Sequence, residues 1–338
     1  MRIRSLWSLV IVGLLGACGE STEPTLDQAR DQVSAGKAAL PVFACHISGF
    51  YVEPKGVNAK GQIVGSVSFD PDFFGFLCDN RRGVTTDLGT LGGTATGANG
   101  INASGQVVGW GVTQDDQFHA FFWDNGVMTD LGTLPGDDHS VATAINDRGQ
   151  VVGESGTPPG DIPSTSRAVL WQNGALVDLG TLPGMTWSAA YGINARSQVV
   201  GASGAEGTGH AVLWDDGRII ALATLGGPES LASGINAAGQ IVGSAQTSTG
   251  EWHAVVWQRG RVTDLGAGRA HAINNAGVIV GASEGSAVYW RDGQKNVLAQ
   301  ADPDSPANFV ATAISSSGVV VGEANYETNS NAEVWTIR

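Results

Sequence analysis

The sequence predicts an all-β fold: a seven-bladed β-propeller whose blades are four-stranded antiparallel sheets. A ten-residue motif recurs seven times, and its Asn position, which holds Ser315 in the last copy, recurs at steps of 44, 44, 48, 42, 38 and 41 residues. A period of about 40–50 residues is typical of propeller blades. Short β-branched and aromatic runs alternate with Asn, Asp and Gly turn residues, without helical periodicity. Each repeat holds four such runs, which is the number of strands in a blade.

The first motif is an Ile-Asn pair, two residues, a Gly-Gln pair and two β-branched residues that end in Gly. It predicts a first strand, a tight turn and a second strand. The copies are GVNAKGQIVG (56–65), GINASGQVVG (100–109), AINDRGQVVG (144–153), GINARSQVVG (192–201), GINAAGQIVG (234–243), AINNAGVIVG (272–281) and the degenerate AISSSGVVVG (313–322).

Two further motifs follow in a fixed order and predict the third and fourth strands. The third-strand motif occurs as HAFFWDNG (119–126), RAVLWQNG (167–174), HAVLWDDG (210–217), HAVVWQRG (253–260) and SAVYWRDG (286–293). The fourth-strand motif occurs as TDLGTLGG (86–93), TDLGTLPG (129–136), VDLGTLPG (177–184), ALATLGG (221–227) and TDLG (263–266).

This ordered set of INxxGQVVG, HAFxW and DLGTLGG motifs resembles the HAF-type extracellular repeat family over roughly residues 50–338. The resemblance implies an exported bacterial protein with a propeller-like repeat, and it implies no established reaction. The departures are Cys78 at the Trp position and, at the His position, Arg167, Ser286 and Asn331.

The two ends of the repeat region predict how the ring closes. The last unit ends at AEVWTIR (332–338) without a fourth strand, whereas PVFACHI (41–47) precedes the first unit where a fourth strand would lie. We therefore expect the N-terminal strand to complete the last blade.

The N-terminus predicts an export signal. Arg2 and Arg4 precede an apolar stretch from Leu6 to Leu15, which is too short to span a bilayer and is typical of a signal peptide. Leu15-Gly16-Ala17-Cys18 resembles the lipobox of bacterial lipoproteins, which implies cleavage before Cys18 and lipidation of that residue. The alternative is an ordinary secretory signal with a chance cysteine. We expect residues 1–17 to be the signal peptide, 18–40 a tether and 41–338 the propeller domain.

The lipobox resemblance implies that the protein lies in the cell envelope. Residue 19 is Gly, whereas Asp at this position is the usual signal for retention in the inner membrane, so we expect the outer membrane or cell surface. Without residues 1–17 the chain has 16 basic and 32 acidic side chains, a net charge of −16. Such a chain lacks the basic footprint of a nucleic-acid-binding protein. We expect a monomer with a membrane anchor and a protein or glycan partner. In an oxidising compartment Cys45 and Cys78 are expected to form a disulfide.

Residues that recur in every unit are expected to serve the blade. The Asn of each copy is expected to bond turn backbone, Gly61, Gly105, Gly149, Gly239 and Gly277 to adopt positive φ, and the Trp residues to pack between blades rather than stack on a ligand. The His of the third motif is expected to pair with the Asp of the fourth (Asp87, Asp130, Asp178 or Asp264). The repeat offers no clustered ligand set for zinc.

Ligand binding is expected on one face. In a four-stranded meander the first–second and third–fourth turns share a face, and these turns are short and nearly invariant. The other face carries variable loops, where binding residues are usually found. Off-pattern aromatics and acids there suit glycan stacking or protein contacts. Besides Phe73 and Phe118, the candidates are Trp110, Asp115, Asp116, Asp137, Asp138, His139, Trp187, Trp252 and Tyr326.

No catalytic motif is present: the sequence has no nucleophile elbow, phosphate loop or HExxH. We therefore expect a non-catalytic binding or scaffolding module with no cofactor. Calcium in the DPD (70–72) or DDH (137–139) loops stays open, although the full ligand series is lacking. The alternative function is an extracellular glycan hydrolase or lyase with an acidic site in the propeller mouth. Singleton carboxylates converging there would favour it.

Overall fold

The computed structural model describes residues 51–69, 72–156, 166–205, 208–299, 308–326 and 330–337, without the side chains of residues 69 and 72. The signal peptide, the lipidation site Cys18, the tether, the expected closing strand 41–47 and Cys45 lie outside the described residues. Within these ranges the chain forms strands and turns, and contains no helix long and apolar enough to cross a membrane.

The strands follow the repeat, and we number the units by the motif copies. Unit 1 contains β1 (Tyr51–Val57), β2 (Gln62–Phe69), β3 (Asp72–Asp79) and β4 (Val84–Asp87). Unit 2 contains β5 (Gly92–Ile101), β6 (Val107–Thr113), β7 (Phe118–Asp124) and β8 (Val127–Asp130). Unit 3 contains β9 (His139–Ile145), β10 (Val151–Gly156), β11 (Arg167–Gln172) and β12 (Ala175–Asp178). Unit 4 contains β13 (Trp187–Ile193), β14 (Val199–Ala205), β15 (Thr208–Asp215) and β16 (Arg218–Ala221).

The remaining units continue this pattern. Unit 5 contains β17 (Gly226–Ile235), β18 (Ile241–Thr247), β19 (Trp252–Gln258) and β20 (Arg261–Ala267). Unit 6 contains β21 (Arg269–Ile273), β22 (Ile279–Ser283), β23 (Ser286–Arg291) and β24 (Gln294–Ala299). Unit 7 contains β25 (Asn308–Ile314), β26 (Val319–Asn325) and β27 (Ser330–Thr336).

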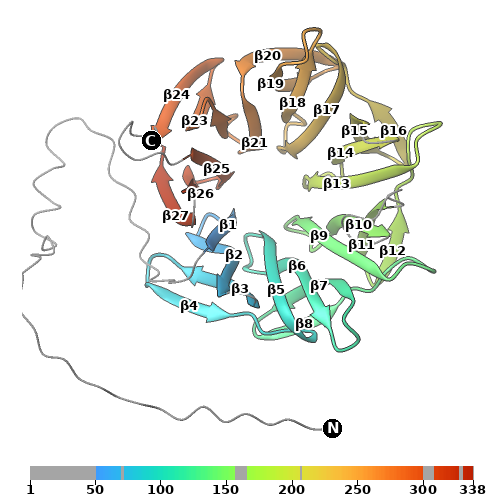
Figure 1. Ribbon diagram of the computed structural model, residues 1–338, viewed down its shortest axis with the longest axis vertical. Coiled ribbons are helices and arrows are strands. Elements are labelled where there is room, and N and C mark those ends of the chain that lie inside the picture. The colour runs from blue at the N-terminus through green and yellow to red at the C-terminus, as the bar shows by residue number, and fades with distance from the viewer. Residues whose placement is uncertain are drawn as a thin grey trace, which may run out of the picture. The chain divides into compact units, whose positions relative to one another are not determined.

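The strands of each unit pair antiparallel in chain order, as a meander. Units 2 to 6 are separate four-stranded sheets, whereas units 7 and 1 form one seven-stranded sheet in the order β25-β26-β27-β1-β2-β3-β4. The two parts of this sheet are joined by a single parallel bridge between Tyr51 and Ser330. The sheets are arranged radially around a central axis (Figure 1), which confirms the predicted all-β propeller architecture.

The first strand of each unit is the innermost, and each contacts the first strand of the next unit. The contacts run from β1 through β5, β9, β13, β17 and β21 to β25, and β25 contacts β1 (Figure 1). The fourth strands lie at the periphery, where β4 is fully exposed. The axis is therefore surrounded by first-strand residues.

The Asn of the first motif stabilises its turn as predicted. In unit 1, Asn58 Oδ1 accepts hydrogen bonds from the backbone N–H groups of Lys60 and Gln62, at 3.0 and 3.1 Å. Gly61 closes the turn at φ 78°, a left-handed conformation that favours glycine. Ser197 occupies the same slot in unit 4 and adopts φ 64°.

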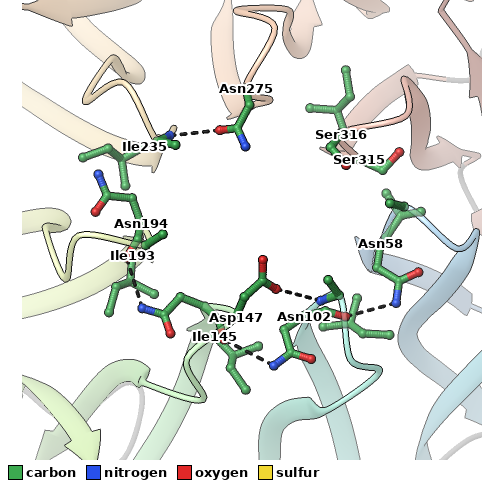
Figure 2. A pocket seen from close by; sticks show the side chains of 18 residues that line it. Asn58, Asn102, Ile145, Asp147, Ile193, Asn194, Ile235, Asn275, Ser315 and Ser316 are labelled. Atoms are coloured by element: carbon green, nitrogen blue, oxygen red, sulfur yellow. Dashed lines mark hydrogen bonds between the residues drawn. The ribbon is translucent and has the colours of Figure 1, made fainter.

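The same Asn side chains also join neighbouring units, which was not predicted. Asn58 Nδ2 donates to the carbonyl of Asn102 in the next unit at 3.0 Å, and each later Asn repeats this contact; Figure 2 shows the first members of the series. We call this series the asparagine girdle. Its other bonds are Asn102 to Asn146 (3.2 Å), Asn146 to Asn194 (3.0 Å), Asn194 to Asn236 (3.1 Å), Asn236 to Asn274 (3.2 Å) and Asn274 to Ser315 (3.3 Å).

The core lies between units, as predicted for the Trp residues. Trp123 packs with Val64, Leu77 and Leu88 of unit 1 and is 7 % exposed. Trp171 Nε1 donates to the carbonyl of Leu131 in the preceding unit at 3.0 Å. Each such indole buries on the order of 200 Å², so these contacts hold adjacent sheets together. The equivalent buried residues are Trp214, Trp257, Trp290 and Trp335.

Cys78 takes the Trp position in unit 1 and is fully buried. It packs with Val52, Ile63 and Val334, so it lies between units 1 and 7. Its expected disulfide with Cys45 stays a prediction.

A bulge interrupts every first strand three residues before the Asn. In unit 4 the pairing register of β13 and β14 shifts between Ala190 and Gly192, so that Tyr191 is the extra residue. Opposite each bulge stands the Gly that ends the first motif. A Cβ added at Gly201 would collide with the carbonyl oxygen of Ala189, and the equivalent Gly of every unit has the same environment. The bulge therefore explains why the motif ends in Gly.

Candidate functional site

The variable-loop face carries a row of neighbouring aromatic rings from three units. Phe73 in β3 lies 6.4 Å from Trp110 in β6, and Trp110 lies 5.4 Å from Phe118 in β7, measured between ring centroids. Phe118 stacks on His139 in β9 at 5.1 Å with an interplanar angle of 28°. We call these four residues the aromatic row. The structure thus brings two predicted site residues, Trp110 and His139, together with Phe73 and Phe118.

The row ranges from exposed to buried. Phe73 is 40 % exposed, whereas His139 is 9 % exposed. Trp110 lies directly against Gly97, where an added Cβ would come within 2.6 Å of the indole Nε1. Gly97 therefore provides the space in which this indole lies flat on the inner strand.

The predicted acids around the row have different roles. Asp115 and Asp116 lie exposed in the turn between β6 and β7, where Asp116 adopts φ 58°. Asp138 is exposed, and its Oδ1 lies 3.5 Å from His139 Nδ1. Asp137 accepts a hydrogen bond from the Ser155 hydroxyl at 2.8 Å, which fixes the loop between β8 and β9.

The other predicted aromatics lie in separate contacts. Trp187 packs over a glycine of its own unit, since a Cβ at Gly209 would lie 3.0 Å from its ring. Trp252 is covered by Arg269, whose guanidinium carbon lies 4.4 Å from the ring centroid. Tyr326 is half-buried after β26. The candidates therefore divide into one continuous row and three isolated positions.

The predicted His–Asp pairing is present in two units. His119 Nδ1 lies 2.8 Å from Asp130, and His253 Nδ1 lies 2.9 Å from Asp264. In unit 3 the same slot holds Arg167, whose guanidinium lies 2.9 Å from Asp178. Because an Arg serves equally well, these pairs fasten the third strand to the fourth and need no imidazole chemistry.

The bulges create a ring of variable residues around the axis that the sequence reasoning missed. The bulge position carries six residue types in seven units: Lys55, Asn99, Thr143, Tyr191, Ser233, His271 and Thr312. Several reach the next unit: Asn99 Nδ2 donates to the carbonyl of Ala142 at 2.8 Å, and Thr312 Oγ1 to that of Pro54 at 2.7 Å. The sequence does mark these residues, because the position three residues before the motif Asn (Ser315 in unit 7) varies from copy to copy.

Charged members of this ring meet where units 6, 7 and 1 adjoin. Lys55 Nζ lies 3.1 Å from Glu323 and 3.2 Å from Glu53. Burial lowers the pKa of Lys55, but the charges of the two glutamates and their hydrogen bonds outweigh it, so the net pKa is raised. Burial also lowers the pKa of His271, and the positive charges of Arg269 and Lys55 lower it further.

Unit 3 holds a half-buried acid, Glu154, in β10. Burial raises the pKa of Glu154, although a hydrogen bond with Ser166 opposes the shift. Burial, with the charge of Glu154, raises the pKa of the bulge residue Tyr191 to about 12. In the described part of the chain no three His, Cys, Asp or Glu side chains lie close enough to share a metal ion. The 70–72 loop considered for calcium falls largely outside that part.

No protein-family model matches this chain, and no curated protein matches it in sequence. Solved propeller structures do resemble it. The β-propeller domain of the Trilobed protease from Pyrococcus furiosus superposes with a TM-score of 0.57 at 10 % identity, over 88 % of this chain and 94 % of that one. A puromycin hydrolase S511A mutant gives a TM-score of 0.58 at 15 % identity, over 87 % of this chain and 53 % of the hydrolase.

The acylaminoacyl peptidase from Pyrococcus horikoshii gives a TM-score of 0.54 at 9 % identity, over 84 % of this chain and 51 % of the peptidase. The chain therefore spans about half the length of these two hydrolases. At such identities the likeness establishes the fold alone, and the fold defines this chain as a β-propeller.

Proposed function

We propose that this protein is a non-catalytic binding module, anchored to the cell envelope through lipidated Cys18, which holds a protein or glycan partner on its variable-loop face. The observation that carries the proposal is the aromatic row. Aromatic rings packed against one another, with one end of the row exposed, offer rigid apolar area at low entropic cost, as binding hot spots and sugar-stacking platforms do. The exposed carboxylates of Asp115, Asp116 and Asp138 flank the row and can accept hydrogen bonds from a ligand's hydroxyl or amide groups.

We further propose that the ring has seven blades and that the 41–47 strand completes the last one, in keeping with the family resemblance to HAF-type repeats. The continuous contacts among the seven first strands support this count. The incomplete sheet of unit 7 supports the closure, because β27 meets β1 through only one bridge. The propeller of the Trilobed protease is described as having an open velcro topology.

The hydrolase alternative gains less support. A glycosidase needs two carboxyl groups that face each other about 5–10 Å apart. The cavity at the invariant-turn mouth of the axis has one carboxylate, Asp147, among its lining residues. Among the described acids of the variable-loop face, Asp115, Asp116 and Asp138 are solvent-exposed, and Asp137 is bonded to Ser155 of β10.

A photocrosslinking experiment tests the binding face. A benzophenone amino acid replaces Phe73, which is 40 % exposed at one end of the row, or Val127, which is 65 % exposed in the third–fourth turn on the other face. Irradiation of whole cells is expected to link the Phe73 variant, and not the Val127 variant, to one specific protein or glycan. The Trp110→Ala substitution is expected to abolish that link. Equal labelling from both positions, or none from Phe73, would overturn the proposal.

The anchor is tested separately. The Cys18→Ala variant is expected to leave the membrane fraction, and mass spectrometry of the wild-type N-terminal peptide is expected to show acyl chains on Cys18. Membrane retention of the variant would overturn the lipid anchor and leave the binding face untouched.

A further inference from the structure

A cavity of about 240 Å³ lies where the first–second turns of all the units converge on the axis, on the face opposite the aromatic row (Figure 2). Every unit contributes the residue after the motif Asn (Ser315 in unit 7), and most units also contribute that Asn and the Ile or Val before it. Small-molecule sites typically measure about 300–1,000 Å³, so this cavity suits a ligand of few heavy atoms.

The residue after each Asn lines this cavity, and its backbone N–H takes no part in the turn. The turn uses the N–H groups two and four residues after the Asn, which bond Asn Oδ1, and leaves the N–H of the next residue outside the turn. Each such N–H therefore faces the position of the equivalent side chain in the following unit.

Two units show what this position accepts. Asp147 Oδ1 accepts the N–H of Ala103 at 2.9 Å, and Asn275 Oδ1 accepts the N–H of Ala237 at 3.0 Å (Figure 2). One acceptor is a carboxylate and the other an amide carbonyl, and both belong to side chains that line the cavity. In two of the units, therefore, a side-chain oxygen of the protein accepts this N–H within the cavity.

In the other units the following side chain is Ala or Ser and supplies no such oxygen. Among the described residues, the N–H groups of Ala59, Asp147, Ala195, Asn275 and Ser316 have no hydrogen-bond partner. Three of them, on Asn275, Ser316 and Ala59, belong to the consecutive units 6, 7 and 1. The exposed hydroxyl of Ser316 lies in the same arc.

We propose that this arc is a binding site for a carboxylate with a short aliphatic body. A carboxylate lying along the arc would accept these N–H groups as the carboxylate of Asp147 accepts that of Ala103, and hydrogen bonds to a charged acceptor are the stronger kind. The aliphatic body would contact the apolar wall formed by Val57, Ile101 and Ile314. Asp147, the one carboxylate in the lining, stands across the cavity from the arc (Figure 2). The carboxylate comes from a small organic acid or from the C-terminus of a peptide.

The test is a titration of the ¹⁵N-labelled chain with sodium butyrate, followed through backbone amide resonances. We expect saturable shifts at Asn275, Ser316 and Ala59, and smaller ones with butyramide, which has the same shape and no charge. Acetyl-Ala-Ala with a free C-terminus is then compared with its C-terminal amide and with butyrate. If the acid form binds more tightly than both, the natural ligand is the C-terminus of a peptide. Absence of shifts at these amides, or equal shifts with sulfate, would overturn the assignment.

Variants that fill the arc from within give a second test. Ala59→Asn would supply an oxygen to the N–H of Ser316, and Ser316→Asn to that of Asn275, as Asn275 does for Ala237. Each is expected to weaken butyrate binding about tenfold, the effect of losing one charge-assisted hydrogen bond. The control Ala238→Asn changes an exposed residue of the same kind of turn outside the lining, and binding is expected to be unchanged. Equal affinity of the Ala59→Asn variant and wild type, with both folded by circular dichroism, would overturn the proposal.

Discussion

Asn274 Nδ2 donates a hydrogen bond of 3.3 Å to the carbonyl oxygen of Ser315, and the asparagine girdle ends at this bond. Ser315 stands where the other units have Asn, and its hydroxyl is too short to reach the carbonyl of Asn58 in the next unit. Instead, Ser317 Oγ meets the carbonyl of Ala59 at 3.5 Å. The joint between units 7 and 1 is therefore the weakest part of the girdle.

Replacing Ser315 by Asn should complete the girdle. The new Nδ2 would reach the carbonyl of Asn58, while Oδ1 would take over the bond that Ser315 Oγ accepts from the N–H of Val319. We expect the free energy of unfolding to rise by about 1 kcal/mol, the net contribution of one hydrogen bond. Urea denaturation measures it, and a decrease in stability would contradict the proposed geometry.

Removing an internal member of the girdle should destabilise the protein. Asn194 is 4 % exposed, bonds Asn236 in the next unit and organises its own turn. Asn194→Ala leaves buried carbonyl and N–H groups unpaired, so we expect a loss of about 2–4 kcal/mol. Asn331→Ala, on the exposed side of β27, is the control and should change stability by less than about 0.5 kcal/mol. Equal losses in the two variants would contradict the role of the girdle.

The glycine opposite each bulge should not tolerate a side chain. Gly201→Ala places a Cβ against the carbonyl of Ala189, which the strand cannot avoid without losing its pairing. We expect a loss of at least about 3 kcal/mol, or failure to fold. In Gly234→Ala the nearest atom lies at 3.5 Å, an ordinary contact, and this control should fold normally. Thermal unfolding compares the two, and similar melting temperatures would argue against the bulge.

His271 should make stability depend on pH. Its Nδ1 lies 3.0 Å from the carbonyl of Ala311, and burial lowers its pKa from 6.5. The unfolded chain therefore binds the proton more readily. The contribution of His271 is complete above about pH 6.5 and declines as the pH falls through the lower pKa of the folded state. In His271→Gln the loss of stability between pH 7.5 and 5 should be smaller than in wild type.

The control for that experiment is His210→Gln. His210 lies on the third strand of unit 4, where Ala221 replaces the usual Asp partner. Its removal should leave the wild-type pH dependence in place. If both variants behave alike, the titration of His271 is not the cause.

The disulfide expected from the sequence can be tested directly. Peptide mapping without reducing agent should yield a Cys45–Cys78 peptide. Because the bridge would close a loop of about 33 residues, its reduction should cost about 3–4 kcal/mol on the chain-entropy model. Serine at both positions should reproduce the effect of reduction. Free thiols at both residues in the oxidised protein would contradict the pairing.

The sequence was most informative about features repeated in every unit. The period of the Asn positions, the Gly turns and the buried Trp residues each predicted an element that the structure contains, because local turn chemistry and alternation suffice to define a hairpin. It also indicated the variable-loop face. It could not indicate that Phe73, Trp110, Phe118 and His139 form one row, because they come from three units that only the tertiary packing brings together.

Two further features were out of reach for the same reason. The girdle depends on the distance from Asn58 Nδ2 to a carbonyl 44 residues away, and sequence spacing does not give that distance. The bulge is a shift in the pairing register of β13 and β14 at Tyr191. The order of apolar and polar residues in the sequence does not indicate such a shift. Both arise between strands or between units.

The bulges have a consequence for how such a protein can change over generations. In an ordinary strand, side chains alternate between the two faces of the sheet. A substitution made there for a new function therefore also affects the packing on which folding depends. Here the extra residue stands outside that alternation, and Lys55, Thr143, Tyr191 and His271 occupy one structural position with four different chemistries. A point mutation at any one of them changes the chemistry near the axis and leaves the pairing of the strands in place. Duplication of the unit thus supplies both a stable architecture and one position in each unit at which the side chain can vary.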